Sequence, residues 1–154
     1  MTLAAAQIIN AVAVRMRNGT LAGADVYTSR AWPLSERDLP AWRVTAANED
    51  VRPLTLSANP TQQHELQIDL SGYFQAVQDV DDSLHAITLE ALGLLFPAVP
   101  GTPDALDALI PRVFLSLRRI ERFMQTEGEA TLGKVSITLL ATYRTRASAP
   151  DTLV

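Results

Sequence analysis

The chain has 154 residues, of which 47% are hydrophobic and 19% charged, and its formal net charge at pH 7 is −4. A chain of this length can bury roughly 70% of its unfolded surface without disulfides, so we expect one soluble domain, 1–154. The absence of cysteine excludes disulfides and cysteine-ligated metals. The acidic balance excludes the overall basic surface of nucleic-acid-binding proteins. No apolar run approaches the ~20 residues that cross a bilayer, so no membrane partner is expected.

The first predicted element is a helix from Thr2 to about Arg17. Thr2 is a suitable N-cap, and Asn18-Gly19 is a typical helix stop. The arginines of this segment follow its apolar part, which is the reverse of a signal peptide. One face of the helix is apolar and is expected to pack on the sheet or on a neighbouring subunit, and its residues are Ala5, Ile9, Val12 and Met16.

Two short strands are predicted next, over residues 26–32 and 41–46. Their connection is too short for a crossover helix, so we expect them to be antiparallel neighbours. Residues 48–62 then show two prolines and little periodicity. A segment of this length without periodicity is typical of a functional or disordered loop. We therefore expect it to be loose in a free subunit and to become ordered against a partner.

The stretch 63–77, QHELQIDLSGYFQAV, alternates between apolar and polar side chains. A period of two puts each set on its own face of a β-strand. We therefore expect one face on a core and the other towards water or a partner, with Tyr73 and Val77 as apolar exceptions on the polar side. The apolar positions are Leu66, Ile68, Leu70, Gly72, Phe74 and Ala76, and the polar ones are Glu65, Gln67, Asp69, Ser71 and Gln75.

An amphipathic helix is predicted to follow, because from Val80 the apolar spacing becomes helical until Pro97. Asp79, Asp81 and Asp82 precede or open it and are suited to cap its first turn. A strand followed directly by such a helix predicts an α/β or α+β layer architecture with the helix on the sheet. Prolines limit the next segment to at most two helical turns, over residues 104–109.

Residues 113–125 are compatible with two structures. The spacing of Val113, Leu117 and Ile120 favours a helix, whereas Val113, Leu115 and Leu117 also fit a strand. Residues 134–144 alternate cleanly and predict a second long strand. If 115–125 are extended, the intervening loop pairs them with 134–144 as an antiparallel hairpin. The tail, 148–154, is predicted to be frayed.

Candidates for catalysis are few. His64 and His85 are isolated from other metal-ligating residue types, and the aspartates before the second helix are explained by capping and the helix dipole. No phosphate-binding loop or nucleophile elbow is present. An enzyme that uses Asp79, Asp81 and His85 is therefore the least favoured hypothesis. A last cluster combines arginines with glutamates and is interpreted as a solvated, salt-bridged face. Its arginines are Arg112, Arg118, Arg119 and Arg122, with Glu121 among them and Glu127 and Glu129 after them.

The order of these parts resembles a known family. The features that carry the likeness are the first helix, a strand leading to Arg30 and Pro33, an acidic turn ending in Leu39-Pro40, a strand beginning AWRV at 41–44, a long loop, HELQIDLSGYF at 64–74, a helix with aspartates at its start, and a closing strand ending ATYRT at 141–145. In this order the chain resembles the tail terminator proteins of long-tailed bacteriophages, which include the minor tail protein U family. The linker 97–111 is richer in proline than the family pattern.

The resemblance implies an α+β fold, with a single mostly antiparallel sheet and helices packed on one face, and it implies a strand over 113–125. It also implies a non-enzymatic virion tail protein that is assembled in the bacterial host cytoplasm. Such proteins close into a hexameric ring on the tail tube, stop its polymerisation and present the surface to which the head-completion protein docks. DNA is then only passing cargo, and no cofactor is needed.

Partner-binding residues are expected where exposed polar or aromatic side chains meet turns and the polar strand face. These candidates are Arg30, Trp32, Arg37, Arg52, Leu54, Glu65, Gln67 and Asp69. No catalytic, cofactor-binding or metal-ligating residue is expected. The alternative function is a small α+β module of a bacterial cell that binds a ligand or serves as an accessory domain.

Overall fold

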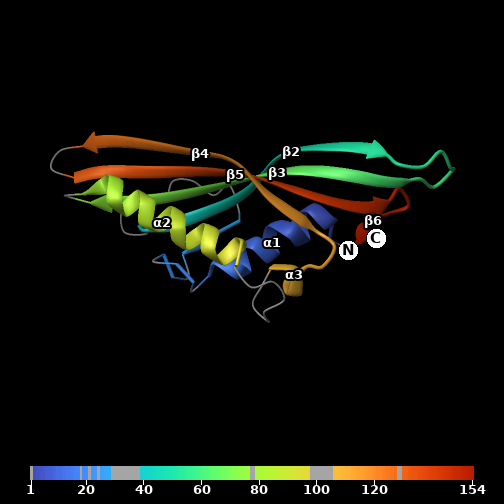
Figure 1. Ribbon diagram of the computed structural model, residues 1–154, viewed down its shortest axis with the longest axis horizontal. Coiled ribbons are helices and arrows are strands. Elements are labelled where there is room, and N and C mark those ends of the chain that lie inside the picture. The colour runs from blue at the N-terminus through green and yellow to red at the C-terminus, as the bar shows by residue number, and fades with distance from the viewer. Residues whose placement is uncertain are drawn as a thin grey trace.

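The predicted strand over 63–77 lies at the centre of a six-stranded sheet in the computed structural model, as β3 (Thr61–Ala76). The structure describes residues 2–17, 19–20, 22–23, 25–28, 39–76, 79–97, 106–127 and 130–154. The other elements are α1 (Ala4–Met16), β1 (Val26–Tyr27), β2 (Ala41–Pro53), α2 (Val80–Leu95), α3 (Leu106–Leu109), β4 (Phe114–Glu127), β5 (Ala130–Arg146) and β6 (Ala149–Leu153) (Figure 1).

The sheet has the strand order β1-β2-β3-β5-β4, and β6 pairs with the end of β5. Its long pairs β2–β3, β3–β5 and β4–β5 are all antiparallel. Both long helices lie on the same side of the sheet (Figure 1). The predicted α+β class, with a mostly antiparallel sheet and helices on one face, is therefore confirmed.

The core lies between the helices and what we call the inner face of the sheet. The even positions of β3 lie directly opposite the odd positions of β5. Leu66, Ile68 and Leu70 are thus paired with Ala141, Leu139 and Ile137, respectively. All six side chains are buried. Helix α1 adds Ile8, Val12 and Met16, and helix α2 adds Leu84, Ile87, Ala91 and Leu95. The period of two read from the sequence is thus the period of burial.

The segment 113–125 is the strand β4, and the hairpin with β5 is confirmed. A β-bulge between Leu117 and Arg119 explains why its sequence also suits a helix. Leu117 pairs with Leu139 and Ile120 with Ile137, so both face inward although they are three residues apart. The extra residue of the bulge, Arg118, shifts the alternation by one and produces a helix-like spacing inside a strand.

The predicted loop over 48–62 is wrong in extent. Strands β2 and β3 remain paired from Glu49↔Leu66 to Pro53↔Gln62, and only 54–60 connects them. That connection is also held in place: Leu54 N donates to Thr61 O (2.8 Å), and Ser148 N donates to Asn59 Oδ1 (2.9 Å). Pro53 is compatible with β2 because an edge strand does not need a donor on its free side. We call residues 49–66 the β2–β3 arm, since both strands continue there beyond the helices (Figure 1).

Two predictions of pairing are also wrong. Strand β1 is parallel to β2, with Val26 opposite Trp42. The thirteen positions 28–40 that separate the strands meet the dozen or so that a parallel connection needs, so the sequence argument underestimated this connection. Residues 29–32 of the predicted first strand lie outside the described residues. The tail is not frayed, because β6 pairs with β5 at Thr145 and Arg146, beyond the first residue of β4. It is also held by Gln7, whose Nε2 donates to Asp151 O (2.8 Å).

Neither long helix is capped as predicted. Leu3 occupies the N-cap of α1 and Asp79 that of α2, and neither makes a side-chain cap hydrogen bond. Asp79 instead has left-handed backbone angles, with φ of 56°. Asp81 and Asp82 lie in the first turn of α2, where their charge complements the helix dipole. No helix in the described part of the chain is long and apolar enough to span a membrane.

We predict that Gly72→Ala destabilises the fold by roughly 1–3 kcal/mol, the usual cost of overpacking. A Cβ at Gly72 lies 2.9 Å from Trp42 Cη2 and 3.0 Å from Val135 Cγ1, and both of these side chains are buried. Urea denaturation of the purified chain measures the change. The matched control is Gly93→Ala in α2, where a Cβ meets nothing within 4 Å and a gain of about 1 kcal/mol is expected. Equal stability of Gly72→Ala and the wild type would contradict this packing.

Candidate functional site

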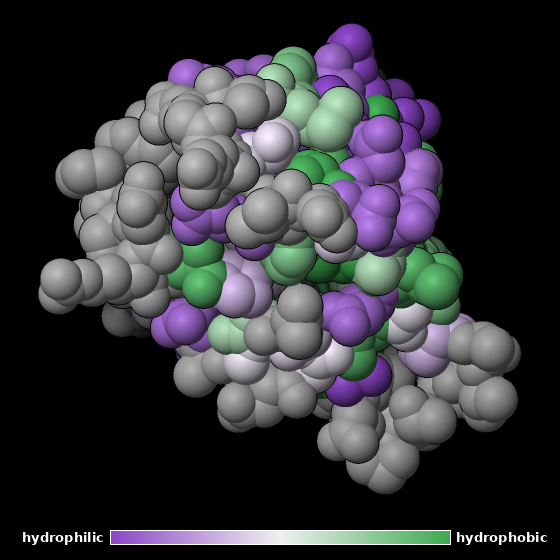
Figure 2. Space-filling view, turned by 90° about the vertical axis from the view of Figure 1, so that its left-hand side faces the viewer, coloured by the Kyte–Doolittle hydropathy of each residue, from purple (hydrophilic) through white to green (hydrophobic). Residues whose placement is uncertain are grey.

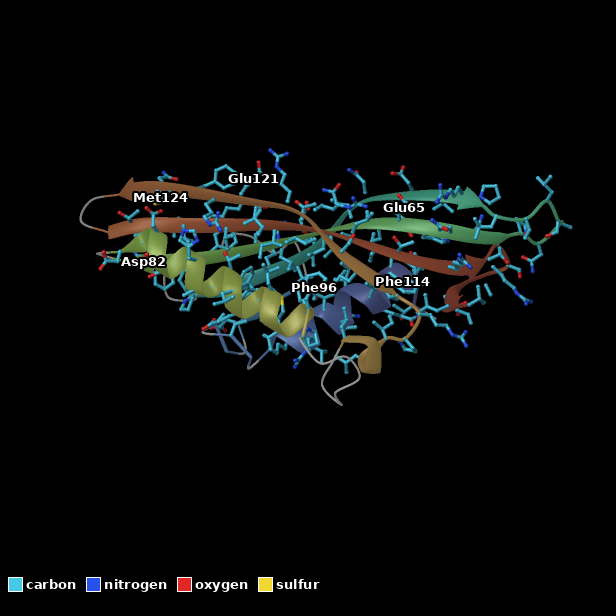
Figure 3. All side chains as sticks on the ribbon, viewed as in Figure 1. Glu65, Asp82, Phe96, Phe114, Glu121 and Met124 are labelled. Carbon is cyan, nitrogen blue, oxygen red and sulfur yellow. The ribbon has the colours of Figure 1, made fainter. Side chains whose placement is uncertain are left out.

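The face of the sheet turned away from α1 and α2, which we call the outer face, is covered by none of the described helices (Figure 1). Its side chains are polar over most of its length, with charges of both signs. Arg52 pairs with Glu65 at 3.6 Å, and Arg119 pairs with Glu121 at 2.7 Å. Glu65 and Glu121 lie on this side of the sheet, towards opposite ends (Figure 3). The outer face is therefore a mixed and partly ion-paired surface without a strong charge of one sign.

The structure brings five of the predicted partner-binding residues together. Glu65, Gln67 and Asp69 are successive outer-face residues of β3, and Gln67 Nε2 donates to Asp69 Oδ1 (3.2 Å). Arg52 lies beside this row at the end of β2, and Leu54 follows in the turn. Leu56, two residues after Leu54 and not predicted as a site residue, is fully exposed. The predicted residues Arg30, Trp32 and Arg37 lie outside the described residues.

A shallow depression of about 230 Å³ lies beside the exposed ion pair of Arg52 and Glu65. It lies on the β2–β3 arm and is lined by Asp50, Val51, Arg52, Gln63 and Glu65. Ligand pockets are usually about 300–1,000 Å³ and mostly apolar. This depression is smaller and more polar, so it does not have the form of a small-molecule site.

The other half of the outer face carries a short aromatic row. Lys134 lies between Tyr73 of β3 and Phe123 of β4, and these three are directly opposite one another across the strands. Lys134 Nζ is 5.7 Å from the centre of the Tyr73 ring and 5.8 Å from that of Phe123. These distances suit cation–π attraction. The row explains why Tyr73 interrupts the polar side of β3.

A polar group that the sequence pattern did not indicate lies on the inner face of the arm. We call it the inner polar cluster, and it consists of the buried residues His64, Tyr143 and Thr145 and the partly exposed Glu49. His64 Nδ1 lies 2.8 Å from Glu49 Oε1, and His64 Nε2 lies 2.9 Å from Thr145 Oγ1. The hydroxyl of Tyr143 donates to Glu49 Oε1. The rings of His64 and Tyr143 stack at 4.7 Å with 12° between their planes.

The inner polar cluster is better suited to holding the arm than to catalysis. His64 is only 8% exposed and both of its ring nitrogens have partners, so neither is available to a substrate. Burial raises the pKa of Tyr143 far above its ordinary value, and the hydrogen bond to Glu49 and the charge of Glu49 raise it further. Tyr143 therefore stays protonated and donates to Glu49 at all physiological pH values. The cluster joins β2, β3 and β5 by side-chain hydrogen bonds.

The acidic group at the start of α2 does not gather into a site. Asp79, Asp81, Asp82 and His85 are all exposed. No group of three potential metal-ligating side chains is found among the residues that the structure describes. Of the predicted salt-bridged arginine face, Arg119 pairs with Glu121 and Arg112 donates to Leu153 O (3.2 Å), while Glu129 lies outside the described residues.

No family model matches the chain, and no curated protein matches it. Among solved structures, it is similar to a chain in the virion of a native gene transfer agent (GTA) particle, with 16% sequence identity and a TM-score of 0.48. The similarity covers 93% of this chain and 96% of that chain.

We predict that Tyr143→Phe lowers the free energy of unfolding at neutral pH by roughly 1–3 kcal/mol, because it removes the hydrogen bond that the buried tyrosine donates to the carboxylate of Glu49 and hydrogen bonds to charged groups contribute about this much. The matched control is Thr152→Val, which removes an exposed hydroxyl bonded to Asp151 Oδ1 at 3.4 Å and is expected to cost less than about 0.5 kcal/mol. Chemical denaturation at pH 7 measures both. Equal costs would mean that the inner polar cluster does not stabilise the arm.

The same tyrosine predicts a pH dependence. Its pKa is higher in the folded than in the unfolded chain, so its contribution is complete below about pH 10, the unfolded value. As the pH rises above 10 the unfolded chain loses this proton first, and stability falls by up to about 1.4 kcal/mol per pH unit. Tyr143→Phe should show a shallower alkaline loss than the wild type in denaturation series from pH 8 to 11. Parallel curves would contradict the assignment.

Proposed function

We propose that the chain is a structural subunit of a phage-type tail, and that it closes into a ring on the end of the tail tube, stops tube polymerisation and offers the surface to which the head docks. The observation that carries this proposal is the one-sided sheet. Its helices are confined to one face, which leaves an outer face, two strand edges and an apolar loop for contacts. A ring subunit needs several such surfaces at once, whereas an enzyme or ligand-binding module needs a concave pocket.

The outer face suits the passage of DNA in this function. A surface with many unpaired lysines and arginines would retain DNA by releasing its counterions. Here the ion pairs Arg52–Glu65 and Arg119–Glu121 neutralise two of the arginines on this face, and the net charge of the chain is −4. A ring built from this subunit would let DNA pass as cargo without binding it strongly.

The two ends of the long strands differ, which a terminator also requires. Ending a tube needs one surface that complements the growing end and another that does not repeat it. The connection 54–60 at one end carries the exposed side chains of Leu54 and Leu56. We assign this loop to the contact with the tube end, because exposed apolar side chains at a loop tip favour burial against a partner.

The alternative, a small ligand-binding module, is not supported by a specific feature of the described structure. Its best location would be the depression beside Arg52 and Glu65, which is small and open. The terminator hypothesis therefore remains the function that the geometry supports best, and it requires no catalytic residue or cofactor.

We predict that deleting this chain's gene from its phage or prophage yields tail tubes that exceed their normal length and fail to join heads. Without a cap, the tube end continues to accept subunits. Electron micrographs of the lysate give the tail lengths and the fraction of joined particles, and complementation with the wild-type gene is the control. Tails of normal length that are joined to heads would refute the terminator function.

We further predict that Leu54→Ser combined with Leu56→Ser leaves the fold intact but impairs capping. Both side chains are exposed, so their loss costs little stability, while a contact with the tube end would lose its apolar part. The matched control is Leu89→Ser, an equally large apolar change at an exposed position of α2. Complementation of the deletion should fail for the double variant and succeed for Leu89→Ser. If both variants restore tail length, the loop has no role in capping.

A further inference from the structure

The sheet has two free edges in the described part of the chain. One is β4, whose neighbour is β5 alone over Phe114–Glu127. The other is β2 beyond Arg43, because β1 pairs only with Trp42 and Arg43. The residues of β2 from Ala46 to Pro53 are all exposed. Long free edges are templates for pairing with another strand, and monomeric proteins usually shorten, charge or cover them.

The edge formed by β4 is unusually apolar for a strand in contact with water. Leu117 is 41% exposed, Phe123 is 52% exposed, and Phe114 and Met124 are more exposed still. Met124 lies on β4 near the far end of the hairpin (Figure 3). Viewed from this end, apolar side chains reach the surface between polar ones (Figure 2). This edge therefore has more to gain from burial than a typical edge strand.

The charges on the two free edges indicate which strand pairs with the β4 edge. Arg118 and Arg122 on β4 have no ion-pair partner among the described residues, and neither has Asp50 on β2. If two β4 edges paired about a twofold axis, their arginines would lie close to one another, which is unfavourable. The β2 edge offers Asp50 together with the half-exposed Val51. The better partner for a β4 edge is thus the β2 edge of a second copy.

Strand direction agrees with this choice. β2 is antiparallel to β3, β3 to β5 and β5 to β4, so β2 and β4 run in opposite directions within one sheet. A neighbouring copy that is related by rotation keeps its strand directions, and its β2 would therefore meet β4 in an antiparallel pair. Each copy uses one edge of each kind, which is a head-to-tail contact that closes into a ring when the rotation permits.

We infer that β4 of one copy pairs with β2 of the next, so that the sheets of neighbouring subunits are continuous. The register places Val51 opposite Leu117 on the inner face, because both are apolar and partly exposed there. It then brings Asp50 to the bulge of β4, beside Arg118 and Arg119. This inference rests on the proposed ring and assigns it a specific interface. If the interface proves wrong, the capping function is still tested separately, by the tail lengths of the deletion lysate.

Cysteine cross-linking tests the register directly, because the chain has no cysteine of its own. The full-length double variant Val51→Cys/Leu117→Cys is oxidised and analysed by non-reducing electrophoresis and native mass spectrometry. We expect a ladder of covalent oligomers that ends at the ring size of the unmodified protein. The matched control is Val51→Cys/Phe123→Cys, whose second cysteine is on the same strand and similarly exposed but on the outer face. It should cross-link at less than about one tenth of that yield.

The remaining outcomes overturn the inference. Covalent dimers from Leu117→Cys alone would show that two β4 edges pair with each other. A chain that stays monomeric, or a ring that forms without Val51–Leu117 cross-links, would show that these edges do not meet. A reversal of charge tests the same interface. Asp50→Arg should weaken ring formation at least about tenfold, and adding Arg118→Asp should restore most of the ring formation. Equal assembly of Asp50→Arg and wild type would also overturn the inference.

Discussion

The structure depends on the pairing of β3 with β5. Their register is continuous from Thr61↔Arg146 to Ala76↔Thr131, with no irregularity along its length. A slip of one residue would turn the buried row of β3 towards water and bring Glu65 and Gln67 into the core. Bulges lie in β2 and β4, on either side of this pair, and a further irregularity lies in the pairing of β5 with β6. The regular β3–β5 pair determines which face of the sheet the helices cover. The bulged strands β2 and β4 lie outside this pair and form most of the edges of the sheet.

Alternation of side chains predicted this centre well. Leu66, Ile68 and Leu70 were expected on one face because they recur at every second residue, and they are buried. Alternation of side chains is lost at the bulges, so it did not predict the strands there. At Arg118 an added residue changes the phase, so a strand resembles a helix, and the family resemblance gave the better prediction. Between Ala46 and Glu49 a second bulge interrupts β2, and the same loss of periodicity made the sequence of a paired strand resemble a loop.

The candidate site was predictable only where it follows the regular strand. Glu65, Gln67 and Asp69 form an outer-face row as expected, but their neighbours were not foreseen. His64 holds an even position of the same strand, which already placed it with the apolar row. What the sequence could not show is that the bulge in β2 turns Glu49 towards it and that Tyr143 comes alongside from β5. Such clusters depend on register between distant strands, and no local pattern encodes that register.

The continuous pairing of β3 with β5 also has a consequence for how the chain folds. β2–β3 and β4–β5 are hairpins of neighbouring strands, so each can form from local contacts, whereas β3 and β5 are separated by all of α2, α3 and β4. Pairings of this kind slow folding, because the entropy of closing the intervening chain is lost before the contacts form. The joining of the two hairpins is therefore the step that we expect to limit the folding rate. Until that step, a newly made chain exposes the inner edges of both hairpins in addition to the two edges that remain free in the native sheet.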